Sequence, residues 1–229
     1  MNTFRPPFYT TLFTVSSHHP YDLPLGYEKK FKGGPMIIHR TIEYTDYSLR
    51  KFFETASHMP WYKKTLFVFT ADHASAEIQY QEYNSAWGYF SIPIFFYKPG
   101  EDWASLKPEI VQQIDIMPTI LGYLNYDKPY VAFGRDIFKK DTEPFAFNYL
   151  DNTFQAFMGN YLLMFDGAKS SALYDFKKDV RLQNNLLLQV PDTVAKMEIK
   201  LKGLIQQYNN RMVDDDLTME GPQAKVINH

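Results

Sequence analysis

The order of apolar and polar positions along the chain predicts an α/β protein. Residues 8–15 alternate apolar or aromatic side chains with threonine, which predicts a strand. In residues 38–56 apolar positions recur at helical spacing with charged residues between them, which predicts an amphipathic helix. Residues 65–70 form a nearly continuous apolar run, typical of a strand buried on both faces, and residues 92–97 predict another strand. This order favours a largely parallel sheet with helices packed on it.

The second half of the chain is predicted to combine hairpins with two helices. Asp115 is placed to cap a helix whose first turn accepts Pro118. A last helix is predicted to begin near Pro191, and the residues beyond Asp214 are expected to form a tail. Short aromatic strands between residues 145 and 175 are separated by hairpin-type pairs, namely Asp151-Asn152, Gly159-Asn160 and Asp166-Gly167. These segments predict a small antiparallel sheet followed by a terminal helix.

Composition restricts the classes of function. The 229 residues are 45% hydrophobic and 17% aromatic, which is enough for a folded core. A net charge of -2 and a pI near 6.3 offer no basic surface for nucleic acid. No run approaches the roughly 20 apolar residues that span a bilayer, so the chain itself is expected to be soluble. The absence of cysteine excludes disulfides, thiolate metal sites and a cysteine nucleophile.

Asp72 and His73 are candidate metal ligands because they follow an apolar strand directly. Ligands collect in the crevice beyond the carboxyl ends of strands in open α/β sheets. A carboxylate oxygen and an imidazole nitrogen together suit Zn²⁺ or Mn²⁺. Neighbouring side chains of a regular strand point to opposite faces, so both can reach one ion only if the chain turns at this pair. The alternative is that Asp72 caps a following helix and His73 is a surface residue.

Three further residues carry candidate chemistry. His18 and His19 stand in a polar group at the end of the first predicted strand, and the alternative for them is a pair of loop histidines before a proline. Arg135 could reach an anion, but pairing at the surface with Asp136 or Asp141 is the favoured interpretation.

Seven short phrases stand in the order found in one protein superfamily. The chain resembles the C-terminal half of the sulfatase and lipoteichoic acid synthase branch of the alkaline phosphatase superfamily, over roughly residues 8–190. The phrases are Ser17-His18-His19-Pro20-Tyr21, Ile42-Glu43-Tyr44-Thr45-Asp46, Ala71-Asp72-His73, Ile92-Pro93-Ile94 with Lys98-Pro99-Gly100, Gln113-Ile114-Asp115-Ile116-Met117-Pro118-Thr119, Gly134-Arg135-Asp136 and Leu173-Tyr174-Asp175-Phe176.

The resemblance implies a fold and a set of site residues. The implied fold is a partial three-layer α/β/α sandwich of the alkaline phosphatase type, with a small C-terminal antiparallel sheet and a terminal helix. Its parts would be residues 1–143 of the catalytic α/β domain, a subdomain of residues 144–212 and a tail of residues 213–229. Asp72 and His73 would ligate a divalent metal ion (Mn²⁺, Zn²⁺, Mg²⁺ or Ca²⁺). His18 would contact the phosphate or head group of the substrate, and His19 could exchange roles with it.

The chain also departs from the family pattern. The family's nucleophile and its first acidic metal ligand lie before the matching region, so we expect the chain to be a fragment that is inactive alone. The expected parent is a membrane-anchored or exported bacterial protein whose extracytoplasmic domain is a sulfuric ester hydrolase or a phosphoglycerol-type transferase. Its partners would be a glycerophospholipid or sulfated glycan and the N-terminal half of the same protein. Whether the chain itself is an enzyme stays open.

Two other classes of function remain open. The chain could be a non-catalytic module that binds an anionic glycan or lipid head group, with Trp87, Tyr89 and Phe90 stacking on a sugar ring. It could also be a structural remnant in which Asp72 and His73 hold nothing.

Overall fold

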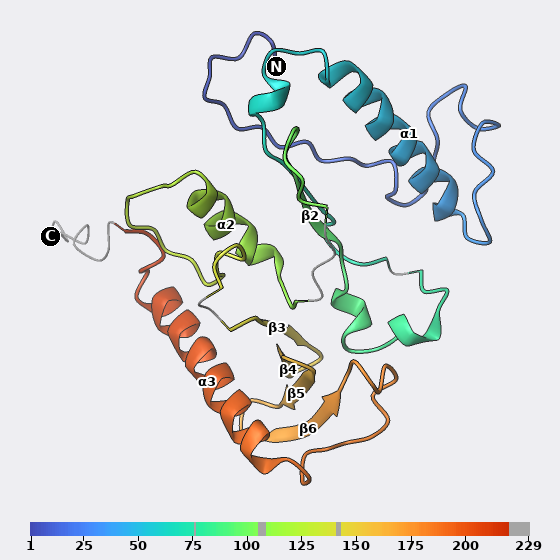
Figure 1. Ribbon diagram of the computed structural model, residues 1–229. Helices are drawn as coiled ribbons and strands as arrows, with labels where there is room; N and C mark the ends of the chain where they lie inside the picture. The colour runs from blue at the N-terminus through green and yellow to red at the C-terminus, as the bar shows by residue number, and fades with distance from the viewer. Residues whose placement is uncertain (76, 105–108, 141–142, 220–229) are drawn as a thin grey trace, which may run out of the picture. The chain divides into compact units, whose positions relative to one another are not determined.

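The chain folds into two compact units. The computed structural model describes residues 1–75, 77–104, 109–140 and 143–219. One unit comprises Met1–Phe69 and Phe95–Ser105, and the other comprises Thr70–Ile94 and Leu106–His229. Both contain helices and strands, so the predicted α/β class is confirmed (Figure 1). No helix of the described residues is long and apolar enough to cross a membrane.

The first unit packs a helix against a two-stranded sheet through aromatic rings. Helix α1 (Ile38–Ala56) has the predicted bounds, and the sheet pairs β1 (Phe67–Thr70) with β2 (Ile94–Tyr97). The ring of Phe53 on α1 lies 5.1 Å from that of Phe67 and 5.6 Å from that of Tyr97, centroid to centroid. Within the sheet Phe69 stacks on Phe95 at 4.6 Å. Edge and stacked ring contacts of this kind add about 0.5–1.5 kcal/mol each beyond the buried area.

A short 3₁₀ turn, η1 (Tyr62–Lys64), connects α1 to β1. Its Tyr62 hydroxyl shares a 2.9 Å hydrogen bond with the hydroxyl of Tyr97 on β2. This bond to Tyr97 raises the pKa of Tyr62 to about 12. The contact ties the turn to β2, the strand that β1 pairs with.

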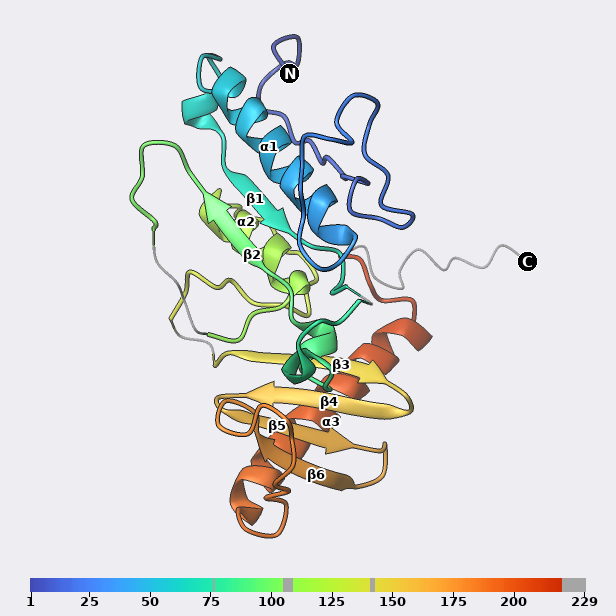
Figure 2. The same cartoon turned by 90° about the vertical axis from the view of Figure 1, so that its right-hand side faces the viewer.

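The prediction of a largely parallel sheet is wrong for β1 and β2. Their arrows point in opposite directions in Figure 2. A parallel pair needs a long crossover, usually a helix. The described part of the segment between them contains only two 3₁₀ turns, η2 (Gln81–Tyr83) and η3 (Gly88–Phe90). The described residues of this connection therefore supply no crossover helix.

Residues 8–15, predicted as a strand, form none. The segment pairs with no strand of the described residues, and its apolar side chains other than Phe8 are exposed. Tyr9, Leu12 and Phe13 keep 82%, 79% and 67% of their surface accessible. An alternating pattern favours an extended backbone, but a strand also requires a neighbour to accept and donate its backbone hydrogen bonds.

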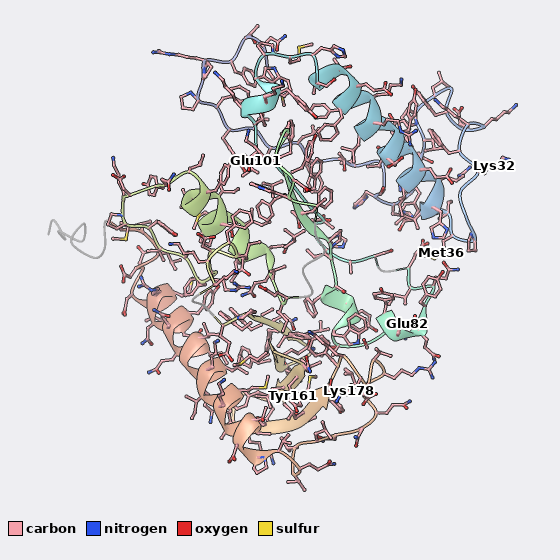
Figure 3. The ribbon with its side chains drawn as sticks, viewed as in Figure 1. Lys32, Met36, Glu82, Glu101, Tyr161 and Lys178 are labelled. Carbon is pink, nitrogen blue, oxygen red and sulfur yellow. The ribbon has the colours of Figure 1, made fainter. Side chains whose placement is uncertain are left out.

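The second unit contains the predicted antiparallel sheet. Its four strands follow one another in chain order and are β3 (Phe145–Leu150), β4 (Thr153–Met158), β5 (Tyr161–Phe165) and β6 (Ser170–Asp175). All three predicted turns join them. Asp151, Asn152, Gly159 and Gly167 have φ values of +49°, +58°, +58° and +99°, which tight hairpin turns require. After β6 the ammonium of Lys178, labelled in Figure 3, lies 3.8 Å from the Asp175 carboxylate.

Helix α3 (Pro191–Val213) covers one face of this sheet (Figure 2). Leu163 on β5, Leu173 on β6 and Leu201 on α3 are fully buried where helix and sheet meet. Pro191 occupies the first turn of the helix, where its missing N–H leaves no hydrogen bond unmade. The predicted sheet and terminal helix are therefore confirmed, and they pack against each other as two layers.

We expect Leu163→Ala to lower the free energy of unfolding by about 2–5 kcal/mol, because it removes buried methyl groups and leaves a cavity. The matched control is Leu188→Ala, whose leucine is 91% exposed and whose loss should change stability by less than about 0.5 kcal/mol. Urea unfolding followed by circular dichroism measures both. Equal effects would contradict the assignment of the core.

Candidate metal centre

Asp72 and His73 lie at a bend of the backbone just after β1. The backbone N–H of His73 donates to Asp72 Oδ1 at 3.0 Å. The other carboxylate oxygen, Oδ2, lies 3.5 Å from His73 Nε2. In a regular strand these side chains would diverge. Both side chains can reach one ion only if the chain turns at this pair, and the bend provides that turn. The two predicted ligands therefore face one another.

The imidazole of His73 is oriented by the backbone that follows it. Its Nδ1 lies 2.8 Å from the carbonyl oxygen of Ala74. A carbonyl oxygen only accepts, so this bond fits the tautomer with the proton on Nδ1 and the lone pair on Nε2. Histidine ligands typically donate their second ring N–H to such a carbonyl. The lone pair of Nε2 and the carboxylate of Asp72 then face the same space, where a cation would stabilise both.

The distance between the two candidate donor atoms matches that between two ligands of one tetrahedral ion. Two atoms that each lie about 2.1 Å from a tetrahedral ion are about 3.4 Å apart. Nε2 of His73 and Oδ2 of Asp72 are separated by 3.5 Å, and their side chains are 73% and 53% exposed. Among the described residues, no group of three or more His, Cys, Asp or Glu side chains could hold an ion. The part of the chain that is described thus offers two ligands on an open surface.

The alternative is wrong for Asp72, which caps no described helix, but His73 does lie at the surface, with its side chain 73% exposed. The next helical element, η2, begins only at Gln81, and its N-cap is Tyr80. The Asp72 carboxylate accepts the N–H of His73 instead. In Figure 3 Glu82 marks η2 in the loop that follows the pair.

A glutamine from a distant segment holds the bend. The 3₁₀ turn η4 (Gln113–Asp115) begins with Gln113, whose side-chain Nε2 donates to the carbonyl oxygens of Ala71 at 2.8 Å and Asp72 at 2.9 Å. The sequence analysis quoted Gln113 as part of a phrase and assigned it no role. The only signal for such a role along the chain was its place two residues before Asp115, the predicted cap.

Asp115 stands at the predicted N-cap position, but its side chain has another role than capping the helix that follows. It precedes α2 (Ile116–Tyr123), but its carboxylate makes no capping bond to that helix. Oδ2 accepts the N–H of Gln112 at 3.0 Å, which closes a capping box around η4, and Oδ1 accepts the N–H of Arg135 at 2.8 Å. Burial raises the pKa of this carboxyl, while the two N–H donors act in the opposite direction. Asp115 therefore fixes η4 to the loop that contains Arg135.

The predicted surface pairing of Arg135 with Asp136 is wrong. The Arg135 side chain is only 6% exposed, and its guanidinium donates to the Ile110 carbonyl at 3.2 Å and lies 3.8 Å from Glu109. The Asp136 carboxylate instead accepts the N–H of Phe138 at 3.0 Å. Asp141, the other expected partner, lies outside the described residues. Arg135 is thus a buried residue that joins its loop to the segment of Glu109 and Ile110.

His18 and His19 belong to the first compact unit, whereas Asp72 and His73 belong to the second. His18 Nδ1 lies 2.7 Å from the carbonyl oxygen of His19, which fits a proton on Nδ1 by the argument used for His73. Both histidines are exposed. Their segment is joined to α1 by the 3.5 Å contact between the hydroxyls of Ser17 and Thr45.

Comparison with known proteins identifies the family. Residues 1–126 match the family model described as Sulfatase. The chain belongs to the sulfatase family. Lipoteichoic acid synthase 1 of Bacillus subtilis (strain 168) is 24% identical over 203 residues, which cover 81% of this sulfatase-family chain and 30% of the synthase. The lipoteichoic acid synthase of Staphylococcus aureus (strain USA300) is 27% identical over 156 residues, or 59% of this chain and 24% of the synthase.

Solved structures confirm the predicted fold. A protein in the alkaline phosphatase superfamily from Vibrio parahaemolyticus superposes with a TM-score of 0.67 at 24% identity, covering 90% of this chain and 51% of that one. The lipoteichoic acid synthase LtaP from Listeria monocytogenes gives 0.63 at 19% identity, covering 86% and 53%. The chain spans about a third of the length of the Bacillus synthases it matches. The alkaline phosphatase-like fold expected from the seven phrases is therefore shown.

We expect Asp115→Ala to lower the free energy of unfolding by about 1–3 kcal/mol, because the N–H groups of Gln112 and Arg135 lose their acceptor. The control is Asp46→Ala, which removes an exposed carboxylate paired with Arg50 on α1 and should cost less than about 1 kcal/mol. Urea unfolding of both variants checks this. A smaller loss for Asp115→Ala than for Asp46→Ala would refute the anchoring role.

Proposed function

We propose that Asp72 and His73 are ligands of a divalent metal ion in an enzyme that acts on phosphate or sulfate esters. The observation that carries this proposal is the facing arrangement of Asp72 Oδ2 and His73 Nε2, with the imidazole oriented by Ala74. Membership of the sulfatase family supports it. Among the ions implied by the resemblance, the mixed oxygen and nitrogen donors favour Zn²⁺ or Mn²⁺ over Mg²⁺ or Ca²⁺.

Each residue has a distinct task in this proposal. When bound, a divalent ion would neutralise charge on the transferred group and activate the nucleophile. Asp72 contributes a negative charge to the site, and His73 contributes a neutral donor that its bond to Ala74 keeps in the correct tautomer. Neither is assigned the attack on the ester, because the resemblance places the nucleophile before this region.

His18 is proposed to contact the substrate. It would donate a hydrogen bond to a non-bridging oxygen or protonate the leaving group. Since Nδ1 already donates to the carbonyl of His19, donation from Nε2 requires the imidazolium form. His19 is the neighbour that could take over the same task.

The comparisons support two versions of the reaction. The named synthases support a phosphoglycerol-type transfer from a glycerophospholipid, and the family name supports hydrolysis of a sulfate ester, for example on a glycan. In both versions we propose an extracytoplasmic domain of a membrane-anchored or exported bacterial protein. The N-terminal half of that protein would supply the nucleophile.

Titration with Mn²⁺ tests the metal site. We expect weak binding to the purified chain and a loss of at least about tenfold in affinity for Asp72→Ala and His73→Ala, since each removes one of two ligands. The control is His58→Ala, which removes an exposed histidine whose Nδ1 contacts the Glu54 carbonyl at the end of α1. Paramagnetic broadening of backbone amide signals in NMR spectra locates the ion. Broadening that does not centre on residues 72–74, or equal affinity in all variants, would contradict the site.

A binding module remains the second candidate because exposed aromatic rings gather in residues 80–90 of the loop that follows the pair. Tyr80, Tyr83, Tyr89 and Phe90 are 59%, 45%, 43% and 40% exposed, and such rings stack on sugars. Trp87, by contrast, donates its Nε1–H to the carbonyl of Val180 at 2.9 Å and packs on Tyr83.

If the chain is a binding module, glycerol phosphate or a sulfated sugar should bind saturably after removal of metal by EDTA. Tyr80→Ala should then weaken binding of the sulfated sugar, because it removes the most exposed ring of this loop on which the sugar could stack. Tyr9→Ala, which removes an exposed tyrosine of the other unit, is the control. Calorimetry that detects no binding at millimolar ligand would exclude this candidate.

A further inference from the structure

The bend at Asp72 and His73 needs support from outside its own segment. Strand β1 ends at Thr70, so the carbonyl groups that follow are outside its hydrogen-bond ladder. Ala71 O accepts from the Thr70 hydroxyl at 3.0 Å and from Gln113 at 2.8 Å, and Asp72 O accepts from Gln113 at 2.9 Å. Backbone carbonyls that lack a partner destabilise the conformation that isolates them. The side chain of Gln113 therefore satisfies groups that the strand has released.

The two bonds from Gln113 select the bent backbone. In an extended strand successive carbonyls point to opposite edges, so one amide group cannot reach both. Here a single side-chain NH₂ group, with its two hydrogens, contacts two successive carbonyl oxygens, those of Ala71 and Asp72. The same bend brings Asp72 Oδ2 within 3.5 Å of His73 Nε2. Extension of the chain would lose both Gln113 bonds and separate the two ligand atoms.

The turn that contains Gln113 is itself held by the loop of Gly134 and Arg135. The next residues of η4 lie against Gly134, where an added Cβ would overlap the carbonyl oxygen of Ile114. Asp115 accepts the N–H of Arg135 at 2.8 Å and is 2% exposed. All of these residues belong to the same compact unit as Asp72 and His73. The exposed amide of Gln113 thus projects from a turn that its buried last residue, Asp115, anchors.

We propose that Gln113 is a positioning residue for the Asp72 and His73 pair, which it keeps in the bent conformation that lets both side chains face one cation. The inference rests on the proposed function of that pair as metal ligands. It assigns Gln113 no contact with the metal ion or the substrate. Its effect is exerted through the backbone carbonyls of Ala71 and Asp72.

Two substitutions test the proposal in the full chain. Gln113→Met keeps a side chain of similar length but has no N–H donor, and Gln113→Glu places an acceptor against two carbonyl oxygens. Both should weaken Mn²⁺ binding by about tenfold, the effect typical of residues that orient metal ligands. The matched controls are Gln207→Met and Gln207→Glu, which make the same changes at an exposed position of α3 and should leave affinity unchanged.

A second readout separates positioning from general stability. In the metal-free chain, NMR signals of the His73 imidazole and of its backbone N–H should shift in Gln113→Met, because the ring and this N–H contact Ala74 and Asp72 only in the bend. The melting temperature should stay within a few degrees of the unsubstituted chain, since Gln113 is exposed.

Suppose that both Gln113 variants keep the Mn²⁺ affinity and the His73 signals of the unsubstituted chain while Asp72→Ala still weakens binding. The inference would then be overturned, and the proposed function would stand. If Asp72→Ala itself left Mn²⁺ affinity unchanged, the metal role of the pair would fall, and the positioning role would fall with it. Weaker binding in Asp72→Ala and in both Gln113 variants, with silent Gln207 controls, supports both.

Discussion

The end of β1 is the constraint on which the candidate site depends. A strand presents successive side chains to opposite faces, so adjacent ligands can share an ion only where the ladder stops and the chain bends. The ladder stops at Thr70, and the bend places Asp72 Oδ2 and His73 Nε2 3.5 Å apart. Two side-chain bonds from Gln113 replace the backbone bonds that the ladder no longer supplies. The geometry of the pair is thus a property of two segments that are distant in sequence.

Behind this bend lies a small buried polar cluster that joins two of the recognised phrases. Asp115 accepts backbone N–H groups, and Thr119 accepts the N–H of Ile137 at 3.1 Å, so α2 and the Arg135 loop are held together. Both side chains are almost inaccessible, at 2% and 0% exposed. Buried polar groups destabilise a fold unless they are satisfied, and here each one is bonded to a specific backbone position. This gives a physical reason for the spacing between the Gln113 and Gly134 phrases.

The successes and failures of prediction have separate causes. Helix α1 and the hairpin turns at Asp151-Asn152, Gly159 and Gly167 follow from local rules of periodicity and backbone conformation, and their positions were predicted correctly. Residues 8–15 have the pattern of a strand and form none, because pairing needs a neighbour that a pattern cannot specify. Arg135 was placed at the surface because a charged residue usually lies there, yet its guanidinium is buried, where it donates to the carbonyl of Ile110 and lies 3.8 Å from Glu109.

The sequence by itself determined the class of fold, the bounds of most helices and hairpins, and the choice of Asp72 and His73 as candidate ligands. Those features depend on local spacing and on the order of short phrases, both of which are readable along the chain. Only the tertiary structure decided that β1 and β2 are antiparallel, that Asp115 and Arg135 are buried, and that Gln113 holds the bend. These depend on contacts between residues far apart in sequence, and such contacts are set by packing and by hydrogen-bond satisfaction, which have no local pattern.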